Sequence, residues 1–231
     1  MPVALVTGGS RGFGRALAID LAMDGWTLII DGRDEPALQQ TADHLIGLGA
    51  QTTAIAGDVA DPGHRSALIE SASEFGSLDL LVNNASTIGP SPLPPIKNYP
   101  LDELRQVYEV NVFAPTALLQ AALPLLRQAQ GTVVSLSSDA AIEAYEGWGG
   151  YGSSKAALDQ LHRVLAAEEP LLRVYQFDPG DMRTEMHQAA FPGEDISDRP
   201  EPETAVAPLR ALLDSGAPSG RYRVDEWVLQ S

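Results

Sequence analysis

The sequence predicts a single α/β domain in which a doubly wound parallel sheet is covered by helices on both faces. Three observations predict it: apolar runs of strand length recur along the chain, segments of helical periodicity separate them, and a glycine turn follows the first run. The runs are continuously apolar, as in parallel strands that are buried on both faces. One domain over residues 1–231 fits this length, and we place no boundary within it.

Six apolar runs are expected to form the strands. They are VALVT (3–7), TLIID (27–31), TTAIAG (52–57), LDLLVNNA (78–85), GTVVSLSS (131–138) and LRVYQFD (172–178). The segments between them are long enough for the crossover helices that join parallel strands. Asp61 followed by Pro62 is typical of a helix start, and Gly49 and Gly76 stand where two helices should end.

The remaining segments are one long helix and two loops. Residues 101–130 are apolar and contain Pro115 and Pro124, so we expect a kinked or broken helix. Residues 87–100 are rich in proline, and a substrate-loop segment at about 185–203 is polar and acidic. Both are expected to border a ligand pocket above the carboxyl ends of the strands, with walls from Tyr145, Trp148, Met186, His187 and Phe191.

Composition and charge exclude several classes of protein. With 44% hydrophobic and 20% charged residues the chain is globular rather than disordered. Its net charge of -16 would repel nucleic acid and anionic membrane surfaces, so neither is expected as a partner. No stretch of about 18 apolar residues and no basic leader are evident, which indicates a soluble, cytoplasmic protein.

Cysteine and histidine usage excludes thiol chemistry and indicates no metal site. The chain has no cysteine, so disulfides and thiol catalysis are absent. Its four histidines, at positions 44, 64, 162 and 187, are scattered without the spacing of metal ligands. We expect them to be isolated surface residues.

The glycine turn TGGSRGFG is a candidate nucleotide site. It joins the first predicted strand to a predicted helix and carries Gly8, Gly12 and Gly14. Backbone N–H groups and the helix dipole at such a turn bind a pyrophosphate. We expect the intervening residues to contact the cofactor as well, namely Ser10, Arg11 and Phe13.

The end of the second strand, IIDGRD, bears on the choice of nicotinamide cofactor. An arginine there accommodates the 2'-phosphate of NADP, whereas an acidic residue binds the 2'-hydroxyl of NAD. Arg33 and Arg11 therefore favour NADP(H) over NAD(H). Asp31 points the other way, because a carboxylate facing the ribose would repel a phosphate.

The stretch YGSSK sets Tyr151 and Lys155 four residues apart. On a helix this spacing places both side chains on one face, about one turn apart. Taken alone, the pair is also compatible with an ordinary surface helix.

In this order, TGGSRGFG, NNA (83–85), Asn111, Ser138 and YGSSK resemble the short-chain dehydrogenase/reductase family, over about residues 3–184. The resemblance implies a Rossmann-type, NAD(P)-binding sheet. It also implies that Asn111, Ser138, Tyr151 and Lys155 are catalytic. Further cofactor contacts implied by it are Asp58 and Val59 at the adenine, Asn84 and Ala85, and Pro179, Gly180, Met182 and Thr184 at the nicotinamide.

The resemblance also implies a mechanism. Lys155 and the oxidised nicotinamide are expected to lower the pKa of Tyr151, which exchanges a proton with the substrate oxygen. Ser138 would donate a hydrogen bond to that oxygen, and Asn111 would hold Lys155 and a water. We prefer Ser138 to Ser137 because it lies 13 residues before Tyr151, as the family pattern asks.

The sequence departs from the family at three places. Ser86 replaces the last glycine of the N-N-A-G element, and Asp178 replaces the asparagine often found before the Pro-Gly turn. The end of the chain, SGRYRVDEWVLQS, lacks the usual final strand followed by a double glycine. These departures concern the last strand and the floor of the pocket and leave the four catalytic positions unchanged.

These features predict an NADP(H)-dependent oxidoreductase that interconverts a carbonyl and a secondary alcohol on a small organic substrate. A homodimer or homotetramer is expected through the helices at 101–130 and 151–169. The alternative is a non-catalytic NADP(H)-sensing or scaffold protein of the same fold. A sugar-nucleotide epimerase or dehydratase would need an additional substrate domain, for which the chain has no room.

Overall fold

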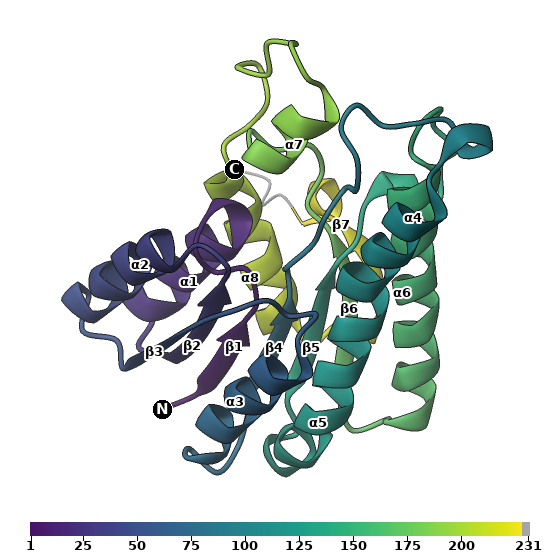
Figure 1. Ribbon diagram of the computed structural model, residues 1–231. Helices are drawn as coiled ribbons and strands as arrows, with labels where there is room; N and C mark the ends of the chain where they lie inside the picture. Colours follow the sequence, from purple (N-terminus) through teal and green to yellow (C-terminus); the bar gives the residue numbers. More distant parts are fainter. Residues whose placement is uncertain (228–231) are drawn as a thin grey trace.

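Seven parallel strands form one sheet in the order β3-β2-β1-β4-β5-β6-β7 (Figure 1). The structure is a computed structural model that describes residues 1–227. Its strands are β1 Val3–Val6, β2 Thr27–Gly32, β3 Thr52–Ala56, β4 Leu80–Asn83, β5 Thr132–Leu136, β6 Arg173–Asp178 and β7 Gly220–Arg223. The doubly wound parallel sheet and all six predicted strands are confirmed.

The seventh strand corrects the sequence analysis. β7 pairs in parallel with β6 over four residues, from Tyr175 opposite Gly220 to Asp178 opposite Arg223. It is an edge strand of polar, partly exposed residues, so it has no apolar run that could reveal it. Residues 228–231, where the sequence shows no double glycine, lie outside the described part of the chain.

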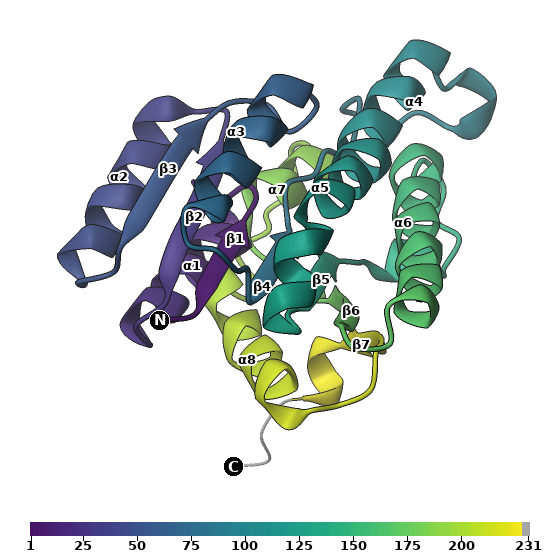
Figure 2. The ribbon, with the colours of Figure 1, turned by 90° about the horizontal axis from the view of Figure 1, so that it is seen from below.

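Eight α-helices are described, and they cover both faces of the sheet. Their bounds are α1 Gly12–Met23, α2 Glu35–Gly47, α3 Pro62–Ser73, α4 Leu101–Tyr108, α5 Ala114–Ala129, α6 Gly149–Glu168, α7 Glu185–Ala190 and α8 Val206–Ser215. Shorter helical turns are η1 Ile96–Asn98, η2 Glu109–Phe113, η3 Asp139–Ala141, η4 Pro202–Ala205 and η5 Val224–Glu226. Figure 2 shows α1 and α8 on one face and α3, α5 and α6 on the other.

Alternation along the strands builds two separate cores. In β1, Ala4 and Val6 pack with α1, α2 and α8, whereas Val3 and Leu5 pack with α3, α5 and α6. Successive side chains of a strand point to opposite faces, so a strand covered on both sides is apolar throughout. The face of the sheet that α6 covers is polar near β5 and β6, where Ser135, Ser137 and Gln176 are buried.

Helix ends follow the signals in the sequence. The Asp61 side chain accepts a hydrogen bond from the Gly63 N–H at the start of α3. Gly49 and Gly76 adopt positive φ angles of 92° and 77° just after α2 and α3. Such a left-handed residue lets the chain leave a helix, and glycine adopts it without a Cβ penalty.

The long helix predicted at 101–130 is broken, as expected. A π-helical turn, η2, separates α4 from α5. Pro115 has no N–H to bond the carbonyl of Asn111 four residues earlier, which accounts for the wider turn there. Pro124 lies inside α5 without ending it.

The segment Leu101–Ala129 is long and apolar enough to cross a membrane by length and a mean hydropathy of 1.3. Half of its most apolar window is buried inside the fold. In α5, Leu118, Leu119 and Leu126 belong to the core beneath the sheet. This segment therefore packs against the sheet as part of the core of the fold.

Candidate active site

A cleft of about 1390 Å³ runs along the carboxyl ends of the strands. The glycine turn and the ends of β2 and β3 line one part of it, and the end of β5, α6 and α7 line the other. The predicted site residues that line it are Gly8, Ser10, Arg11, Gly12, Phe13, Arg33, Asp58, Val59, Asn84, Ala85, Ser138, Tyr151, Lys155, Pro179, Gly180, Met182 and Thr184. The predicted site residues Gly14 and Asn111 do not line the cleft.

The glycine turn is held tightly against the end of β4. Gly8 and Gly12 have φ angles of 67° and 54°, which glycine adopts without strain. Asn84 Nδ2 donates to the carbonyls of Thr7 and Gly8 at 2.8 and 3.1 Å. A Cβ on Gly14 would lie 2.4 Å from the same nitrogen, so this glycine serves close packing rather than cofactor contact.

Asp31 is at the wall of the cleft, where its carboxylate is buried and held by two partners. Its Oδ1 accepts the Gly8 N–H at 2.6 Å, and its Oδ2 lies 2.9 Å from His64 Nε2. Alternation places Asp31 on the α3 face of β2, whereas Gly32 faces Ser10. The carboxylate therefore anchors the glycine turn.

His64 and His162 correct the expectation that the histidines lie on the surface. His64 is buried on α3 against Gly57, and His162 on α6 is 1% exposed. Burial without a strong partner lowers the pKa of His162 to about 4. Among residues 1–227, no group of three or more His, Asp or Glu side chains is placed to hold a metal ion.

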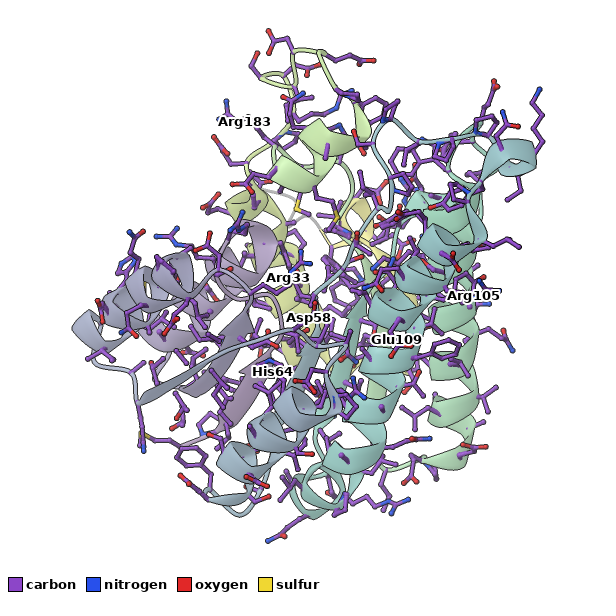
Figure 3. The ribbon with its side chains drawn as sticks, viewed as in Figure 1. Arg33, Asp58, His64, Arg105, Glu109 and Arg183 are labelled. Carbon is purple, nitrogen blue, oxygen red and sulfur yellow. The ribbon has the colours of Figure 1, made fainter. Side chains whose placement is uncertain are left out.

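Two arginines stand at the outer end of the cleft. Arg33 follows β2 and is exposed, near Asp58 at the end of β3 (Figure 3). Arg11 bonds Asp34 at 2.7 Å and also pairs with Glu185 at the start of α7. These contacts raise the pKa of Arg11, so it remains a cation. The Arg11–Glu185 ion pair links the glycine turn to the segment above the cleft.

This end of the cleft fits a dinucleotide. Helix α1 begins at Gly12 without a side-chain cap, so its first N–H groups are free for an anion. A Cβ on Gly8 would lie 2.8 Å from Asn84, so the turn has space only for bare backbone. Arg33 supplies positive charge beside it in an otherwise acidic chain, and Arg11 is at the same end, paired with Asp34 and Glu185.

Tyr151 and Lys155 meet at the wall of the cleft, on the first turns of α6. Lys155 Nζ lies 5.5 Å from the centre of the Tyr151 ring and donates to the Leu136 carbonyl at 2.8 Å. Both side chains are buried. The helical spacing in the sequence therefore corresponds to a real juxtaposition.

The electrostatics of this pair differ from the expectation. Burial raises the pKa of the Tyr151 phenol above its ordinary value, and a hydrogen bond with Ser138 offsets only part of the rise. The carboxylates of Asp178, Asp139 and Asp159 raise it further. Burial also lowers the pKa of Lys155 to about 8. In the ligand-free protein burial therefore keeps Tyr151 a protonated phenol at neutral pH, whereas the expected lowering of its pKa also involves the oxidised nicotinamide.

The two candidate serines face opposite ways. Ser137 is buried under α6, where its hydroxyl donates to Asp159 at 2.7 Å. Ser138 faces the cleft and bonds Asp139 Oδ1 at 3.0 Å. Of the two serines, Ser138 is the one whose hydroxyl acts on the Tyr151 phenol, where it lowers the pKa.

Asn111 is placed differently from the expectation. Its amide is fully occupied by Thr87, whose N–H and carbonyl it bonds at 2.9 and 2.8 Å, and by the hydroxyls of Ser86 and Ser154. It therefore does not contact Lys155 through its side chain. Its backbone carbonyl lies in η2 and cannot accept an α-helical hydrogen bond, because Pro115 has no N–H. Ser86 replaces the family's glycine and supplies one of these contacts.

Aromatic residues form the pocket above Tyr151. Trp148 packs edge-on to Tyr151 at 5.7 Å and against Phe191 at 5.9 Å, and Phe191 stacks on His187 at 4.9 Å. Tyr145 and Met186 also line the cleft, as predicted. The segment predicted as a loop at 185–203 contains the short helix α7, and residues of α7 line this cleft. Figure 1 shows α7 above the carboxyl ends of the strands.

Sequence reasoning missed Asp139. Its carboxylate bonds both Ser138 and the Tyr145 hydroxyl, the latter at 2.9 Å, and it lines the cleft. No periodicity marks it, and its position directly after Ser138 was the only available signal.

Fold and site together define a nicotinamide-dependent oxidoreductase of the α/β class. The family model of short chain dehydrogenases matches residues 2–195, and the chain belongs to this family. It is an NAD(P)-dependent short-chain dehydrogenase/reductase, an enzyme that acts on a small-molecule substrate.

Individual relatives cover nearly the whole chain. A sepiapterin reductase of Mus musculus is 34% identical over 233 residues, which cover 93% of this chain and 87% of the relative. A short chain dehydrogenase from Shigella flexneri complexed with NADP is 31% identical, with a TM-score of 0.89 and 97% of both chains covered. An alcohol dehydrogenase from Thermococcus sibiricus complexed with 5-hydroxy-NADP is 26% identical, with a TM-score of 0.87, covering 96% of this chain and 95% of that one.

Proposed function

We propose that this enzyme interconverts a carbonyl and a secondary alcohol on a small organic substrate with NADP(H). The observation that carries the proposal is the meeting of Tyr151, Lys155 and Ser138 at one wall of a cleft whose far end is the glycine turn. The pocket between them brings together a proton donor, a hydrogen-bond donor and space for a dinucleotide.

The preference for NADP(H) rests on the surroundings of the ribose site. One oxygen of Asp31 is engaged by Gly8 and the other by His64, which disfavours a further bond from a 2'-hydroxyl. Arg33 is exposed beside the glycine turn, where it would pair with a 2'-phosphate. The structural relatives with bound NADP or an NADP derivative support the same choice.

In this proposal each residue has one task. When bound, the nicotinamide supplies the hydride that adds to the carbonyl carbon. Tyr151, a protonated phenol in the ligand-free protein, donates its proton to the carbonyl oxygen. Ser138 Oγ donates a hydrogen bond to the same oxygen as charge develops on it. The reverse reaction, alcohol oxidation, starts from the phenolate, which burial disfavours in the ligand-free protein.

Proton supply would pass behind Tyr151. Lys155 lies beneath the phenol, and a pKa of about 8 allows it to give and take protons near neutral pH. The Asn111 carbonyl, which receives no hydrogen bond from Pro115, is the acceptor that would hold a water on this path.

The pocket indicates the substrate class. Trp148, Phe191 and His187 offer flat apolar surfaces beside Tyr151, so a flat or aromatic carbonyl compound fits. The carboxylate of Asp139 at the floor disfavours anions. Sepiapterin belongs among the first substrates to try, because a sepiapterin reductase is 34% identical to the chain.

Self-association and a cytoplasmic location are part of the proposal. Phe113, Leu161 and Val164 expose apolar side chains on η2 and α6, at 56, 42 and 45%. Covering them in a homodimer or homotetramer would remove apolar surface from water. Sedimentation that finds only monomers would contradict this assembly.

A matched serine pair tests the proposed activity. NADPH oxidation would be followed with sepiapterin, aromatic aldehydes, ketones and quinones. We expect turnover by the wild type, and a loss of about 10²–10³ in kcat for Ser138→Ala. Ser137→Ala serves as the control, because its buried hydroxyl donates to Asp159 under α6. A wild type that binds NADPH but reduces none of these compounds would favour a non-catalytic NADP(H) sensor instead.

A further inference from the structure

A buried polar cluster lies beneath the proposed active site, between α6 and the carboxyl ends of β5, β6 and β7. Arg221 of β7 is at its centre, with 12% of its side chain exposed. Around it are Asp178 of β6 and Asp159 of α6, whose side chains are 4 and 5% exposed. Buried carboxylates are costly unless a cation and hydrogen bonds compensate them.

The Arg221 guanidinium makes contacts to three elements. Its Nη2 donates to the backbone carbonyl of Ser138 at 2.9 Å and to Asp178 Oδ2 at 2.8 Å. Its Nε lies 3.4 Å from Asp159 Oδ2 without hydrogen-bond geometry. The guanidinium plane therefore links β7 to the ends of β5 and β6 and to the helix that carries Tyr151 and Lys155.

Asp178 extends these contacts to the Pro-Gly turn. Its second oxygen, Oδ1, accepts the Gly180 N–H at 3.1 Å. Gly180 has a φ of 70° and lines the cleft next to Pro179. The carboxylate thus receives Arg221 on one side and fixes the backbone of the turn on the other. A neutral asparagine at this position would need no cation, so Asp178 and Arg221 belong together.

We propose that Arg221 is a positioning residue of the active site, holding Ser138 through its carbonyl and the Pro179–Gly180 turn through Asp178. This role rests on the proposed function, because it concerns the place where the nicotinamide end of NADP(H) and the carbonyl substrate would meet. Arg221 itself does not line the cleft.

Arg221 also balances charge behind the phenol. The charged or titratable groups around it are Tyr151, Lys155, Asp159 and Arg163 of α6, Asp178 of β6, Asp139 after β5 and Arg223 of β7. Asp178 and Asp159 both act to raise the pKa of Tyr151. Without Arg221 their charges would be less compensated, and the phenolate would become still less favourable.

Binding of two ligands tests the positioning role without turnover. NADPH spans the whole cleft, whereas adenosine 2',5'-bisphosphate carries only the end proposed for the glycine turn and Arg33. We expect Arg221→Met to weaken NADPH binding about tenfold or more and to leave the affinity for the bisphosphate unchanged. The free energy of one charge-assisted hydrogen bond corresponds to a loss of this size. Arg221→Lys keeps the charge but loses the planar guanidinium. We therefore expect its NADPH affinity to lie between those of the wild type and Arg221→Met.

Two further variants separate positioning from folding. In Arg221→Met the buried carboxylate of Asp178 loses its cation. The double variant Asp178→Asn with Arg221→Met removes that carboxylate, so binding can be measured on it if Arg221→Met alone folds poorly. Arg210→Met is the matched control, because Arg210 is 17% exposed and pairs with Asp20 and Asp24 away from the cleft. It should lower stability without changing the ratio of the two affinities.

The pH profile supplies a second readout that a purely structural role would not move. For alcohol oxidation, Arg221→Met should shift the rise of kcat/KM to higher pH by roughly one unit, and Arg221→Lys should not shift it. Equal affinity ratios and equal pH profiles in wild type and Arg221→Met would overturn the role of Arg221. If the wild type binds NADPH but turns over no substrate, the proposed function fails, while the affinity ratio still decides on Arg221. A wild type that does not bind NADPH would overturn both.

Discussion

The Asp31–His64 pair makes a prediction about stability and cofactor binding. His64→Leu removes the partner of Asp31 Oδ2, at 2.9 Å, while Oδ1 keeps its bond to the Gly8 N–H. The Asp31 and His64 side chains are 1 and 5% exposed, so water cannot replace the lost contact. A hydrogen bond to a buried charged group contributes about 1.5–3 kcal/mol, and breaking a buried pair costs about 3–5 kcal/mol.

Because Asp31 keeps one partner, we expect His64→Leu to lower the free energy of unfolding by about 2–3 kcal/mol. Urea unfolding followed by circular dichroism measures this change. NADPH affinity should fall too, since Asp31 anchors the glycine turn. Asp31→Asn with His64→Leu should cost less than the sum of the single changes.

His44→Leu is the control for this experiment, because His44 is exposed on α2 and its loss should cost no more than about 0.5 kcal/mol. If His64→Leu were as mild as His44→Leu, the pair would not anchor the turn, and our reasoning on Asp31 would be wrong.

Two further predictions concern the cleft. Arg33→Ala should weaken NADPH binding by about 10- to 100-fold and leave NADH binding unchanged, because only NADPH carries the 2'-phosphate. Both affinities are measured by isothermal titration calorimetry, with Arg105→Ala on the exposed helix α4 as the control (Figure 3). An unaltered ratio of NADPH affinity to NADH affinity in Arg33→Ala would show that Arg33 is not part of the cofactor site. Lys155→Met should abolish turnover yet stabilise the fold at pH 7 by roughly 2 kcal/mol, because burial lowers the pKa of Lys155 from 10.5 to about 8. Removing that burial penalty contributes roughly 3 kcal/mol, and the lost bond to the Leu136 carbonyl costs about 1 kcal/mol. The unfolded state binds the proton more tightly than the folded state, so wild-type stability rises between pH 8 and 10.5 and the gain of the variant shrinks there. Urea unfolding at pH 7 and pH 10 checks this, and a gain that does not depend on pH would contradict it.

Much of the fold followed from local patterns. The six apolar strands, the glycine turn and the Asp61–Pro62 helix start are each encoded within a few neighbouring residues. The strand β7 is not, because its residues Gly220–Arg223 are polar and only their pairing with β6 makes them a strand. Likewise, the short helix α7 is stabilised by Met186 and Phe191 packing over Tyr151, a contact that the acidic composition of its segment conceals.

The juxtaposition of Tyr151 and Lys155 was predictable from the sequence, but the long-range partners of other residues around the cleft were not. The spacing of Tyr151 and Lys155 on one helix fixes their contact locally. By contrast, His64 reaches Asp31 from 33 residues away, and Arg221 reaches Ser138 from 83 residues away. Burial then decides the electrostatics: it raises the pKa of Tyr151, whereas charge alone suggested a lower one.

The central claim is that Tyr151 delivers a proton to the oxygen of a carbonyl compound bound beside NADPH. Its most direct test is the single-turnover rate of NADPH oxidation by wild type and Tyr151→Phe with one carbonyl substrate. We expect a loss of about 10²–10⁴ in this rate with NADPH affinity unchanged, because the phenyl ring keeps its packing against Trp148 but has no proton to give. A Tyr151→Phe enzyme that reduces the substrate as fast as the wild type would contradict the claim.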